Sequence, residues 1–284
     1  MSIRPPAVAG TWYPGSAAAL TRAVDEYLSQ AGGDDAAQFE RLVALIAPHA
    51  GLIYSGPVAA YAYRLLRRHA FDIVVLVGPS HYVAFDGVAI YPAGGFQTPL
   101  GMARIAEDCA AEIIAATPVV REYAAAHARE HSLEMQLPFV QHLAPNVPIV
   151  PLVMGSQTAD TARALGDALA ATLRDRRALL VASTDLSHYQ DAATAARLDQ
   201  VVVDHVSRFD ADGLQRALDR NPNHACGGGP TVAVMRAARV LGARDAVVLK
   251  YADSGDVSGD KSSVVGYMAA ALGIRSDPPS VRTA

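Results

Sequence analysis

Residues 41–56 read RLVALIAPHAGLIYSG, an apolar run that stops abruptly at Pro48 and His49. The run has the length and the aliphatic composition of a buried strand, and the Pro and Gly residues after it allow a tight turn. Two later stretches have the same shape. FDIVVLVGPSHYVAFDG (71–87) stops shortly before a histidine, and so does ALLVASTDLSHYQD (178–191). Continuous aliphatic strands of this kind are typical of a parallel sheet.

Strand-like and helical patterns alternate almost throughout the chain. Strands are predicted at 42–47, 73–78, 147–155, 178–183, 246–253 and 263–272, with a strand and a loop in 87–101. Helices are predicted at 16–31, 57–70, 102–117, 130–143, 158–175 and 229–242, with two more in 191–220. Aliphatic strands separated by helices indicate a mostly parallel sheet covered on both faces. We therefore predict a single three-layer α/β domain over 1–284, with a frayed tail at about 275–284.

The composition excludes several classes of protein. The 284 residues are 51% hydrophobic and 18% charged, which is enough apolar material for a sizeable core. The net charge is −4 and the basic residues form no block, so nucleic acid is not expected as a partner. The N-terminus lacks a signal-peptide core, no apolar stretch is long enough to span a membrane, and two cysteines suit a reducing compartment. We therefore expect a cytoplasmic protein.

Polar side chains follow three of the predicted strands at the point where each strand ends. His49, His81 and the pair Asp185 and His188 stand one to a few residues beyond apolar runs. Ligands of open α/β sheets bind in the crevice beyond the carboxyl ends of the strands. If these strands are parallel, the side chains leave from one edge and converge into a site. The alternative is an ordinary set of strand-to-helix caps, with Ser80 and Asp185 as N-caps.

Cys226 is a further candidate, within NPNHACGGGP at 221–230. It stands just before a glycine run and a helix that starts near Pro230, where backbone N–H groups and the helix dipole stabilise a thiolate. These features make Cys226 a candidate metal ligand or nucleophile, and the three glycines a candidate anion-binding nest. The alternative is a buried, inert thiol, which is our interpretation of Cys109 within its helix.

Another cluster lies in HAREHSLE at 127–134. On a helix, His127, His131 and Glu134 share one face at spacings i, i+4 and i+7. The pattern differs from the H-E-x-x-H protease motif, because Glu130 is not next to the first histidine. We predict that His131 and Glu134 line the site, and the role of His127 stays open. The alternative for Glu130 and Glu134 is capping or pairing on the surface.

These motifs together resemble the Memo family, whose bacterial and archaeal members include protein B of the AmmeMemoRadiSam system. The resemblance covers nearly the whole chain and rests, in chain order, on RPPAVAGTWYPGS, APHAGLIYSG, GPSHYVAFDG, EHSLEMQLPF, STDLSHY and CGGGP. It implies a fold similar to that of class III extradiol dioxygenases, which are non-haem iron enzymes. It also implies a metal-capable pocket with His49, His81 and Cys226 as ligands and with Asp185 and His188 close by.

The resemblance does not by itself imply ring-opening chemistry. The dioxygenases use two histidines and one carboxylate, the set expected of Fe(II) oxygenases, whereas Cys226 stands at the third position here. A thiolate is softer, suits Cu(I), Zn or Fe, and is open to oxidation. Family members are associated with iron or copper, so we expect one of these metals rather than zinc.

The leading hypothesis is therefore a metal-dependent, dioxygenase-like redox enzyme that acts on an unknown small molecule. His188, oriented by Asp185, would act as general acid/base, because the usual pKa of histidine lies near working pH. His131 and Glu134 would orient the substrate or a metal ligand. Tyr54 would donate a hydrogen bond to a bound oxygen.

Three other functions stay open at this point. Three ligands and a water form the usual catalytic zinc pattern, which would allow metal-assisted hydrolysis. A pocket that captures a peptide or metabolite without catalysis is a second alternative. The name of the bacterial system also indicates a partner role beside a radical-SAM protein and an AMMECR-type protein.

Overall fold

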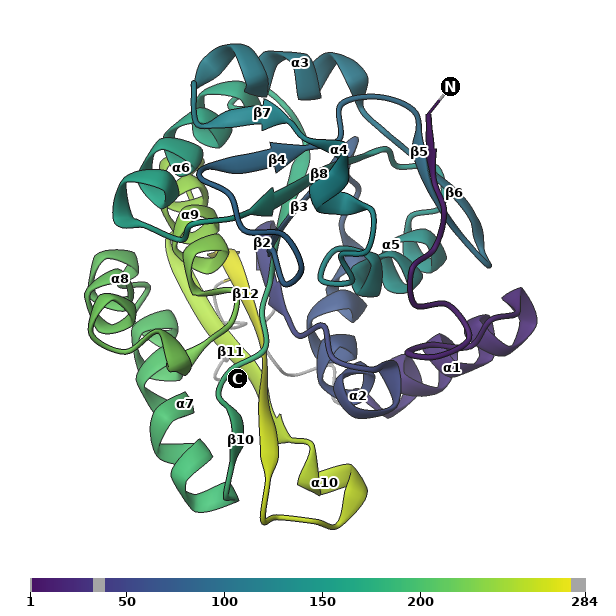
Figure 1. The fold of residues 1–284 in the computed structure, drawn as a ribbon, viewed down its shortest axis with the longest axis vertical. Helices are drawn as coiled ribbons and strands as arrows, with labels where there is room; N and C mark the ends of the chain where they lie inside the picture. Colours follow the sequence, from purple (N-terminus) through teal and green to yellow (C-terminus); the bar gives the residue numbers. More distant parts are fainter. Residues whose placement is uncertain (1, 33–38, 277–284) are drawn as a thin grey trace, which may run out of the picture.

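A computed structural model describes residues 2–32 and 39–276, so the predicted tail lies outside the described residues from 277 on. Helices lie on both faces of a large sheet (Figure 1). This sheet has 9 strands in the order β10-β12-β2-β9-β3-β8-β4-β7, with β11 pairing β12 outside that path. The strands are β2 (Phe39–Ala47), β3 (Ile73–Pro79), β4 (Val88–Ile90), β7 (Val120–Glu122), β8 (Ile149–Met154), β9 (Ala178–Ser183), β10 (His188–Gln190), β11 (Asp245–Asp253) and β12 (Val264–Arg275).

The centre of the sheet consists of four parallel strands, β2, β9, β3 and β8, which lie side by side. Their aliphatic side chains are buried on both faces; Ile46, Val77 and Val181, for example, are 0% exposed. Antiparallel strands extend the sheet at both sides, with β12 on β2 and β4 on β8. The predicted mostly parallel α/β sheet is therefore confirmed, and its continuous aliphatic runs are what burial on both faces requires.

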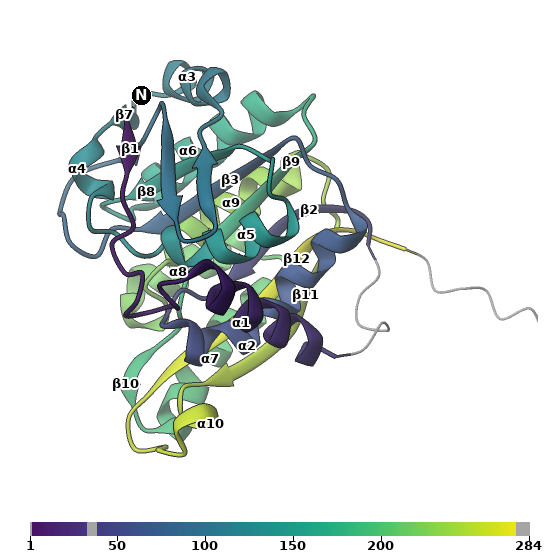
Figure 2. The same ribbon diagram turned by 90° about the vertical axis from the view of Figure 1, so that its right-hand side faces the viewer.

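Helices cover the two faces of the sheet in separate groups (Figure 2). On one face α9 packs on β2, β9 and β3, and α6 packs on α9. On the other face α2 packs on β2 and β12, with α1 and α5 against it. The helices are α1 (Ala17–Gln30), α2 (Leu52–Tyr63), α3 (Glu107–Ala116), α4 (Ala124–His127), α5 (Leu137–Leu143), α6 (Ala159–Leu173), α7 (Ala192–Ser207), α8 (Ala211–Arg220), α9 (Gly228–Val240) and α10 (Gly255–Ser258). Three 3-10 turns are η1 (Arg64–Arg68), η2 (Glu134–Gln136) and η3 (Pro222–His224).

A second sheet ties the N-terminal segment to the body of the protein. It consists of β1 (Ile3–Arg4), β5 (Gly95–Thr98) and β6 (Gly101–Arg104), with β5 in the middle. The helix predicted at 102–117 therefore begins only at Glu107, because β6 takes its first residues. Gly94 has a φ of +89°, and a Cβ there would lie 1.8 Å from Ser2 O, so this close approach of the N-terminal segment requires glycine.

The helix predicted at 130–143 is also shorter than its pattern indicates. Only η2 and α5 are helical there, and Pro138 stands at the start of α5, where its missing N–H is tolerated. Glu130 and His131 lie in the irregular turn before η2. This turn gives their side chains directions that a continuous helix would not.

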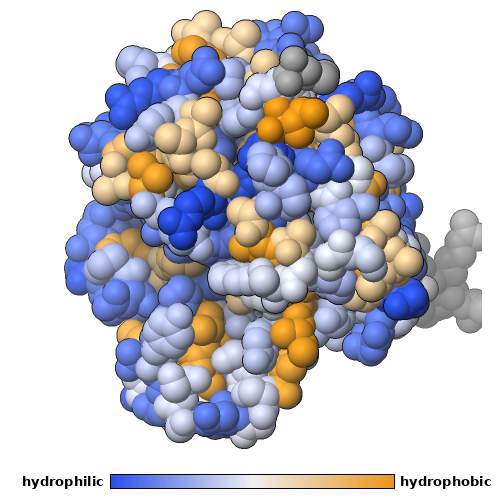
Figure 3. All heavy atoms as spheres, turned by 45° about the vertical axis from the view of Figure 1, so that its right-hand side comes forward, coloured by the Kyte–Doolittle hydropathy of each residue, from blue (hydrophilic) through white to orange (hydrophobic). Residues whose placement is uncertain are grey.

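The surface mixes polar and apolar residues. On the face drawn in Figure 3, hydrophobic residues form separate groups among hydrophilic ones. No helix within the described residues is long and apolar enough to cross a membrane.

Candidate metal centre

The three predicted strand ends meet at one edge of the large sheet. β2, β9 and β3 are adjacent and parallel, so their carboxyl ends point the same way. His49 lies two residues beyond β2, His81 two residues beyond β3, and Asp185 two residues beyond β9. Three segments that are far apart in the sequence therefore meet in the crevice where α/β sheets bind ligands.

Cys226 joins these residues from the loop before α9. Its N–H donates to Asp185 O over 3.2 Å, which fixes the loop against the end of β9. Its Sγ lies 3.2 Å from His49 Nε2. Ligand atoms of His49, His81 and Cys226 all lie within 4.8 Å of one another. Two ligands of one tetrahedral metal are separated by about 3.5 Å, so this trio fits a single ion.

The hydrogen bonds of His49 leave its Nε2 available to a metal. His49 Nδ1 lies 2.9 Å from Ser183 Oγ. That hydroxyl already donates its single proton to Ser132 O and accepts from Gln136 Nε2. It therefore accepts from His49, which places the imidazole proton on Nδ1 and the free lone pair on Nε2. Gln136 is itself held in place, because its Nε2 also donates to Pro48 O.

His81 is oriented by a carboxylate instead of a hydroxyl. Its Nδ1 lies 2.8 Å from Glu130 Oε1, and its backbone N–H donates to Glu130 Oε2. Burial alone would raise the pKa of Glu130, but hydrogen bonds from His81 and Ser132 lower that pKa to about 2. Glu130 is therefore charged at neutral pH. A charged acceptor at Nδ1 leaves Nε2 of His81 as the ligand atom and makes it more basic.

The Cys226 thiol has a different environment from the one predicted. Burial raises the pKa of this thiol above its usual range, and the nearby Asp185 carboxylate raises it further. The Sγ accepts a hydrogen bond from Asp185 N–H over 3.3 Å, so this donor comes from the end of β9 and not from the first turn of α9. The prediction of a thiolate held by the helix N-terminus is wrong. The free protein holds a thiol, which must lose its proton when it binds a metal.

The glycines after Cys226 serve close packing. Gly227 N–H donates to Thr184 Oγ1 and Gly229 N–H donates to Gln157 Oε1, so two donors of the expected nest are already taken. A Cβ on Gly227 would lie 2.3 Å from a carbonyl oxygen at the end of β9. The predicted anion-binding nest is therefore wrong. The glycines let the cysteine loop approach the strand ends, and Gln157 Nε2 fixes the loop further by donating to Cys226 O.

His131 lies against both candidate ligand histidines, so its role as a site-lining residue stays a prediction. Its ring stacks on His81 with centroids 4.4 Å apart, and its edge-on contact with His49 has a centroid separation of 5.5 Å. Trp12 packs on it at 4.3 Å and Tyr82 at 5.8 Å. Burial lowers the pKa of His131 to about 3, and the neighbouring histidines add to this effect. The ring is therefore neutral at physiological pH.

Glu134 is buried, but its carboxylate serves the N-terminal segment. It pairs with Arg4 and accepts from Tyr13 Oη over 2.7 Å. The backbone N–H groups of Ala7 and Val8 donate to the same carboxylate. These four contacts use the acceptor positions that a carboxylate offers, so Glu134 holds the chain near the site and does not present a free oxygen to a substrate.

His127 also helps to hold the N-terminal segment, through Arg4. Its Nε2 donates to Ala89 O over 3.1 Å, and its backbone oxygen accepts from Arg4. Burial lowers the pKa of His127 to about 4, so this ring is neutral as well. The predicted common helix face is wrong, because α4 ends at His127 and His131 lies in the turn beyond it.

Asp185 and His188 both lie beyond β9, but their side chains differ in hydrogen bonding. Asp185 Oδ1 accepts from His49 N–H over 2.7 Å, so the carboxylate holds the backbone of the ligand loop. Within the described residues, His188 Nε2 is buried without a hydrogen-bond partner. Burial lowers the pKa of His188, and the charge of Asp185 offsets part of that effect. Tyr54 lies in the first turn of α2 and is 39% exposed.

The sequence patterns do not predict several residues that support the candidate ligands. Glu130, predicted as capping or pairing on the surface, is 2% exposed and holds His81. Its place in the same short motif as His131 is a signal for the site. Ser183 also has a signal, because it is the last residue of β9. Gln136 has none, since nothing in its local pattern distinguishes it from a core polar residue.

An open α/β sheet with two histidines and a cysteine at its carboxyl edge defines an α/β protein with a candidate metal-binding centre. The comparisons with known proteins then give the family. The chain belongs to the Memo family, because the model of the family described as Memo-like protein matches residues 4–271.

Relatives of similar length support the same assignment. A MEMO1 family protein of Ignicoccus hospitalis is 38% identical over 279 residues, which cover 95% of this chain and 98% of the relative. A MEMO1 family protein of Methanothermobacter thermautotrophicus is 38% identical over 272 residues, which cover 93% of this chain and 98% of the relative. The crystal structure of an uncharacterized Escherichia coli K12 protein has a TM-score of 0.52 at 17% identity, over 80% of this chain and 99% of that one. This last likeness concerns the fold alone.

Proposed function

We propose that this chain is a metal-dependent redox enzyme of the dioxygenase-like kind, in which His49, His81 and Cys226 hold one iron or copper ion beside a small-molecule site. The observation that carries the proposal is the group of three ligand atoms that lie within 4.8 Å of one another. Both histidines have Nδ1 engaged by an internal acceptor, so each would bind a metal through Nε2, which in His49 lies 3.2 Å from Cys226 Sγ. A thiolate beside two imidazoles suits copper or iron.

A redox metal at this position would supply one-electron chemistry to a small molecule bound next to it. The chain's own residues do the positioning. Asp185 holds the backbone of His49, and Gln157 holds the loop of Cys226. His188 offers an unpartnered imidazole nitrogen, which suits the removal of a proton from a bound molecule.

Aromatic rings beside the site support the same proposal. Trp12 and Tyr82 each pack on His131, which itself stacks on His81 and makes an edge-on contact with His49. Tyr54 carries its hydroxyl on the first turn of α2, immediately after the His49 loop. We assign it the role of hydrogen-bond donor to a bound oxygen atom.

Oxygen uptake tests this proposal directly. The protein is purified without oxygen, loaded with Fe(II) or Cu(I), and exposed to O₂ with a mild reductant in an oxygen electrode. We expect uptake above that of the same free metal, lost in Cys226→Ala and His49→Ala and kept in Cys109→Ala. The last variant removes a buried cysteine that lies within α3, away from the centre. Uptake equal to that of the free metal, or unchanged in Cys226→Ala, would contradict the redox assignment.

Metal-assisted hydrolysis is the second candidate, because a donor set with one thiolate and two imidazoles also suits zinc. In that case the three residues would hold zinc, and His188 would accept a proton from a water molecule. The two candidates separate cleanly. Zinc in the purified protein, with activity that does not depend on oxygen, supports hydrolysis and contradicts the redox proposal.

A further inference from the structure

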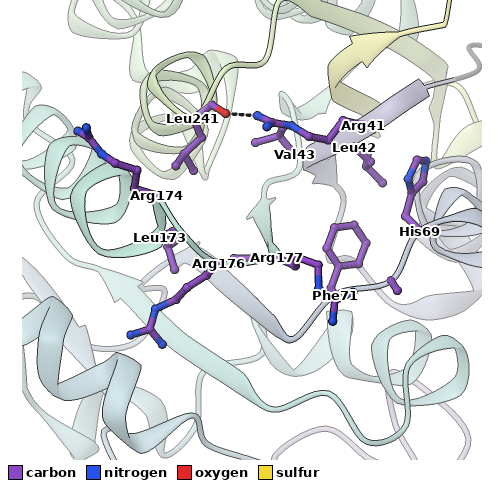
Figure 4. Close-up of a pocket in the computed structure, with 12 residues that line it drawn as sticks. Arg41, Leu42, Val43, His69, Phe71, Leu173, Arg174, Arg176, Arg177 and Leu241 are labelled. Atoms are coloured by element: carbon purple, nitrogen blue, oxygen red, sulfur yellow. Dashed lines mark hydrogen bonds between the residues drawn. The ribbon is translucent and has the colours of Figure 1, made fainter.

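A cavity of about 280 Å³ lies at the amino-terminal edge of the central strands, opposite the candidate metal centre. The first residues of β2 and β9, the segment before β3, and the ends of α6 and α9 surround it (Figure 4). Leu42, Phe71, Leu173 and Leu241 give it apolar walls. Its volume is close to the lower end of the range of about 300–1,000 Å³ that small-molecule pockets occupy.

The ionisable side chains that line this cavity are all basic. They are Arg41, His69, Arg174, Arg176 and Arg177, and the described lining contains no Asp or Glu. Arg176 pairs with Glu112 over 2.6 Å, and Arg177 pairs with Asp72 over 2.7 Å. Both carboxylates lie outside the lining of the cavity. The two ion pairs neutralise two of the four guanidinium charges. Within the described residues, Arg41 and Arg174 have no carboxylate partner.

Arg41 is the cation best placed to contact a ligand. Its Nη2 donates to Leu241 O at the end of α9, and in Figure 4 its side chain extends along one side of the cavity toward that oxygen. The guanidinium groups of Arg174 and Arg176 point away from the centre of the cavity in the same view. Capping of α9 accounts for one N–H group of Arg41, whereas a guanidinium carries five. Its other donors and its charge are left for a ligand.

His69 lines the cavity without adding a second fixed charge. Burial lowers the pKa of His69, and the neighbouring Arg68 lowers it further. The ring is therefore neutral at physiological pH, and it contributes one donor or acceptor. The cavity combines one well-placed cation, a neutral polar group and apolar walls.

We propose that this cavity is a second ligand site, which binds a small monoanion with an apolar body. The anionic group contacts Arg41, and the body lies on Leu42, Phe71 and Leu173. Arg41 is the one unpaired cation that extends along the cavity, and the described lining holds no Asp or Glu, which together favour a ligand with a single negative charge. The leucine and phenylalanine side chains favour a hydrocarbon body. The site shares no residue with the metal centre, so this proposal stands or falls independently of the redox assignment.

Octanoate is a suitable probe, with octanol as its uncharged match. Calorimetric titration of the full chain is expected to show octanoate binding, with octanol weaker by about tenfold or more. Methyl-labelled protein is expected to show octanoate-induced shifts at Leu42 and Leu173, which lie in the cavity. Equal affinities for the two probes, or methyl shifts confined to other leucines, would overturn the proposal.

A charge-removing variant tests the contact with the anionic group. Arg41→Gln keeps a donor for Leu241 O and removes the positive charge. We expect octanoate binding to weaken by about tenfold, with octanol binding and metal content unchanged. Arg163→Gln is the matched control, because Arg163 lies on the surface of α6 in a pair with Asp160. Wild-type octanoate affinity in Arg41→Gln contradicts the proposed contact, and the methyl shifts of the wild-type protein test the site even if the variant does not fold.

Discussion

The segment 127–134 contains two hydrogen-bond networks with different tasks. In one, the Glu134 carboxylate and the His127 backbone bind Arg4 and fix the N-terminal segment. In the other, Glu130 binds His81 and Ser132 supports the serine that orients His49. Both networks are buried and both use residue types that ligate metals. Their carboxylates differ in their partners. That of Glu134 contacts an arginine and backbone groups, whereas that of Glu130 contacts a candidate metal ligand, and the two networks meet at the Glu130 backbone oxygen, which accepts from Arg4.

This difference separates stability from metal binding within one short motif. The Arg4 network contains an ion pair whose loss leaves a buried charge, so damage there should destabilise the fold. The Glu130 network orients a candidate ligand that the fold already positions, so damage there should weaken metal binding first. Variants in the two networks therefore test whether stability and metal binding are separate in this segment.

The largest expected effect is on stability and follows from Arg4→Met. The variant keeps the length of the side chain that covers Phe96 but leaves the Glu134 carboxylate without its cation. We expect the free energy of unfolding to fall by about 3–5 kcal/mol, as measured by urea denaturation. Arg163→Met, which breaks an exposed ion pair, is the control and should change little. Equal stability of the two variants would contradict a structural role for the Arg4 network.

The second effect concerns the pH dependence of stability. Burial lowers the pKa of His127 to about 4, from an ordinary value of 6.5. The folded state therefore keeps this ring neutral while the unfolded state binds a proton below pH 6.5. Stability from this residue is complete above pH 6.5, and about 3 kcal/mol of it is lost as the pH falls to about 4. Urea titrations of metal-free protein should show a steeper acid loss in the wild type than in His127→Gln, and parallel curves would contradict the assignment.

Glu130→Gln is expected to act on metal affinity. The amide can still accept from His81 Nδ1, but it loses the negative charge and one of the two acceptor oxygens that now bind His81. We expect metal affinity to fall by about 10–100-fold, measured by competition with a chelator, with a smaller change in stability than Arg4→Met causes. Glu122→Gln, at an exposed position in β7, is the control. Unchanged affinity in Glu130→Gln would place this carboxylate outside the metal centre.

The smallest effect is expected from Ser183→Ala, which removes a neutral acceptor. His49 Nδ1 and Gln136 Nε2 both lose a partner in this variant. Metal affinity should fall by about tenfold, at the lower end of the range for support of this kind, because the lost acceptor carries no charge. A larger loss of metal affinity in Ser183→Ala than in Glu130→Gln would contradict the expectation that the charged acceptor contributes more than the neutral one.

The fold and the meeting of the candidate ligands at one sheet edge were accessible from the sequence because they depend on local patterns. The aliphatic runs of β2, β3 and β9 indicate a buried parallel sheet, and that sheet alone brings His49, His81 and Asp185 to one edge. The supporting contacts were not accessible in the same way. Ser183 and Gln136 meet through tertiary packing, and no spacing in the chain indicates that contact.

The different roles of the two glutamates also depend on tertiary packing, so the sequence alone does not predict them. Glu130 and Glu134 are one helical turn apart in the sequence and of the same residue type. The irregular turn before η2 directs the first toward His81, and the N-terminal strand brings Arg4 to the second. The Cys226 thiol is a further case, because its environment depends on burial against β9 and not on its distance from a helix N-terminus.

Elemental analysis of protein purified without oxygen tests whether His49, His81 and Cys226 hold a metal ion. We expect about one iron or copper ion per chain in the wild type, with less than a tenth of that content in His49→Ala and a large loss in Cys226→Ser. The Cys109→Ala variant should keep the wild-type content, since Cys109 lies in α3. Wild-type metal content in His49→Ala would contradict the assignment of the centre to His49, His81 and Cys226.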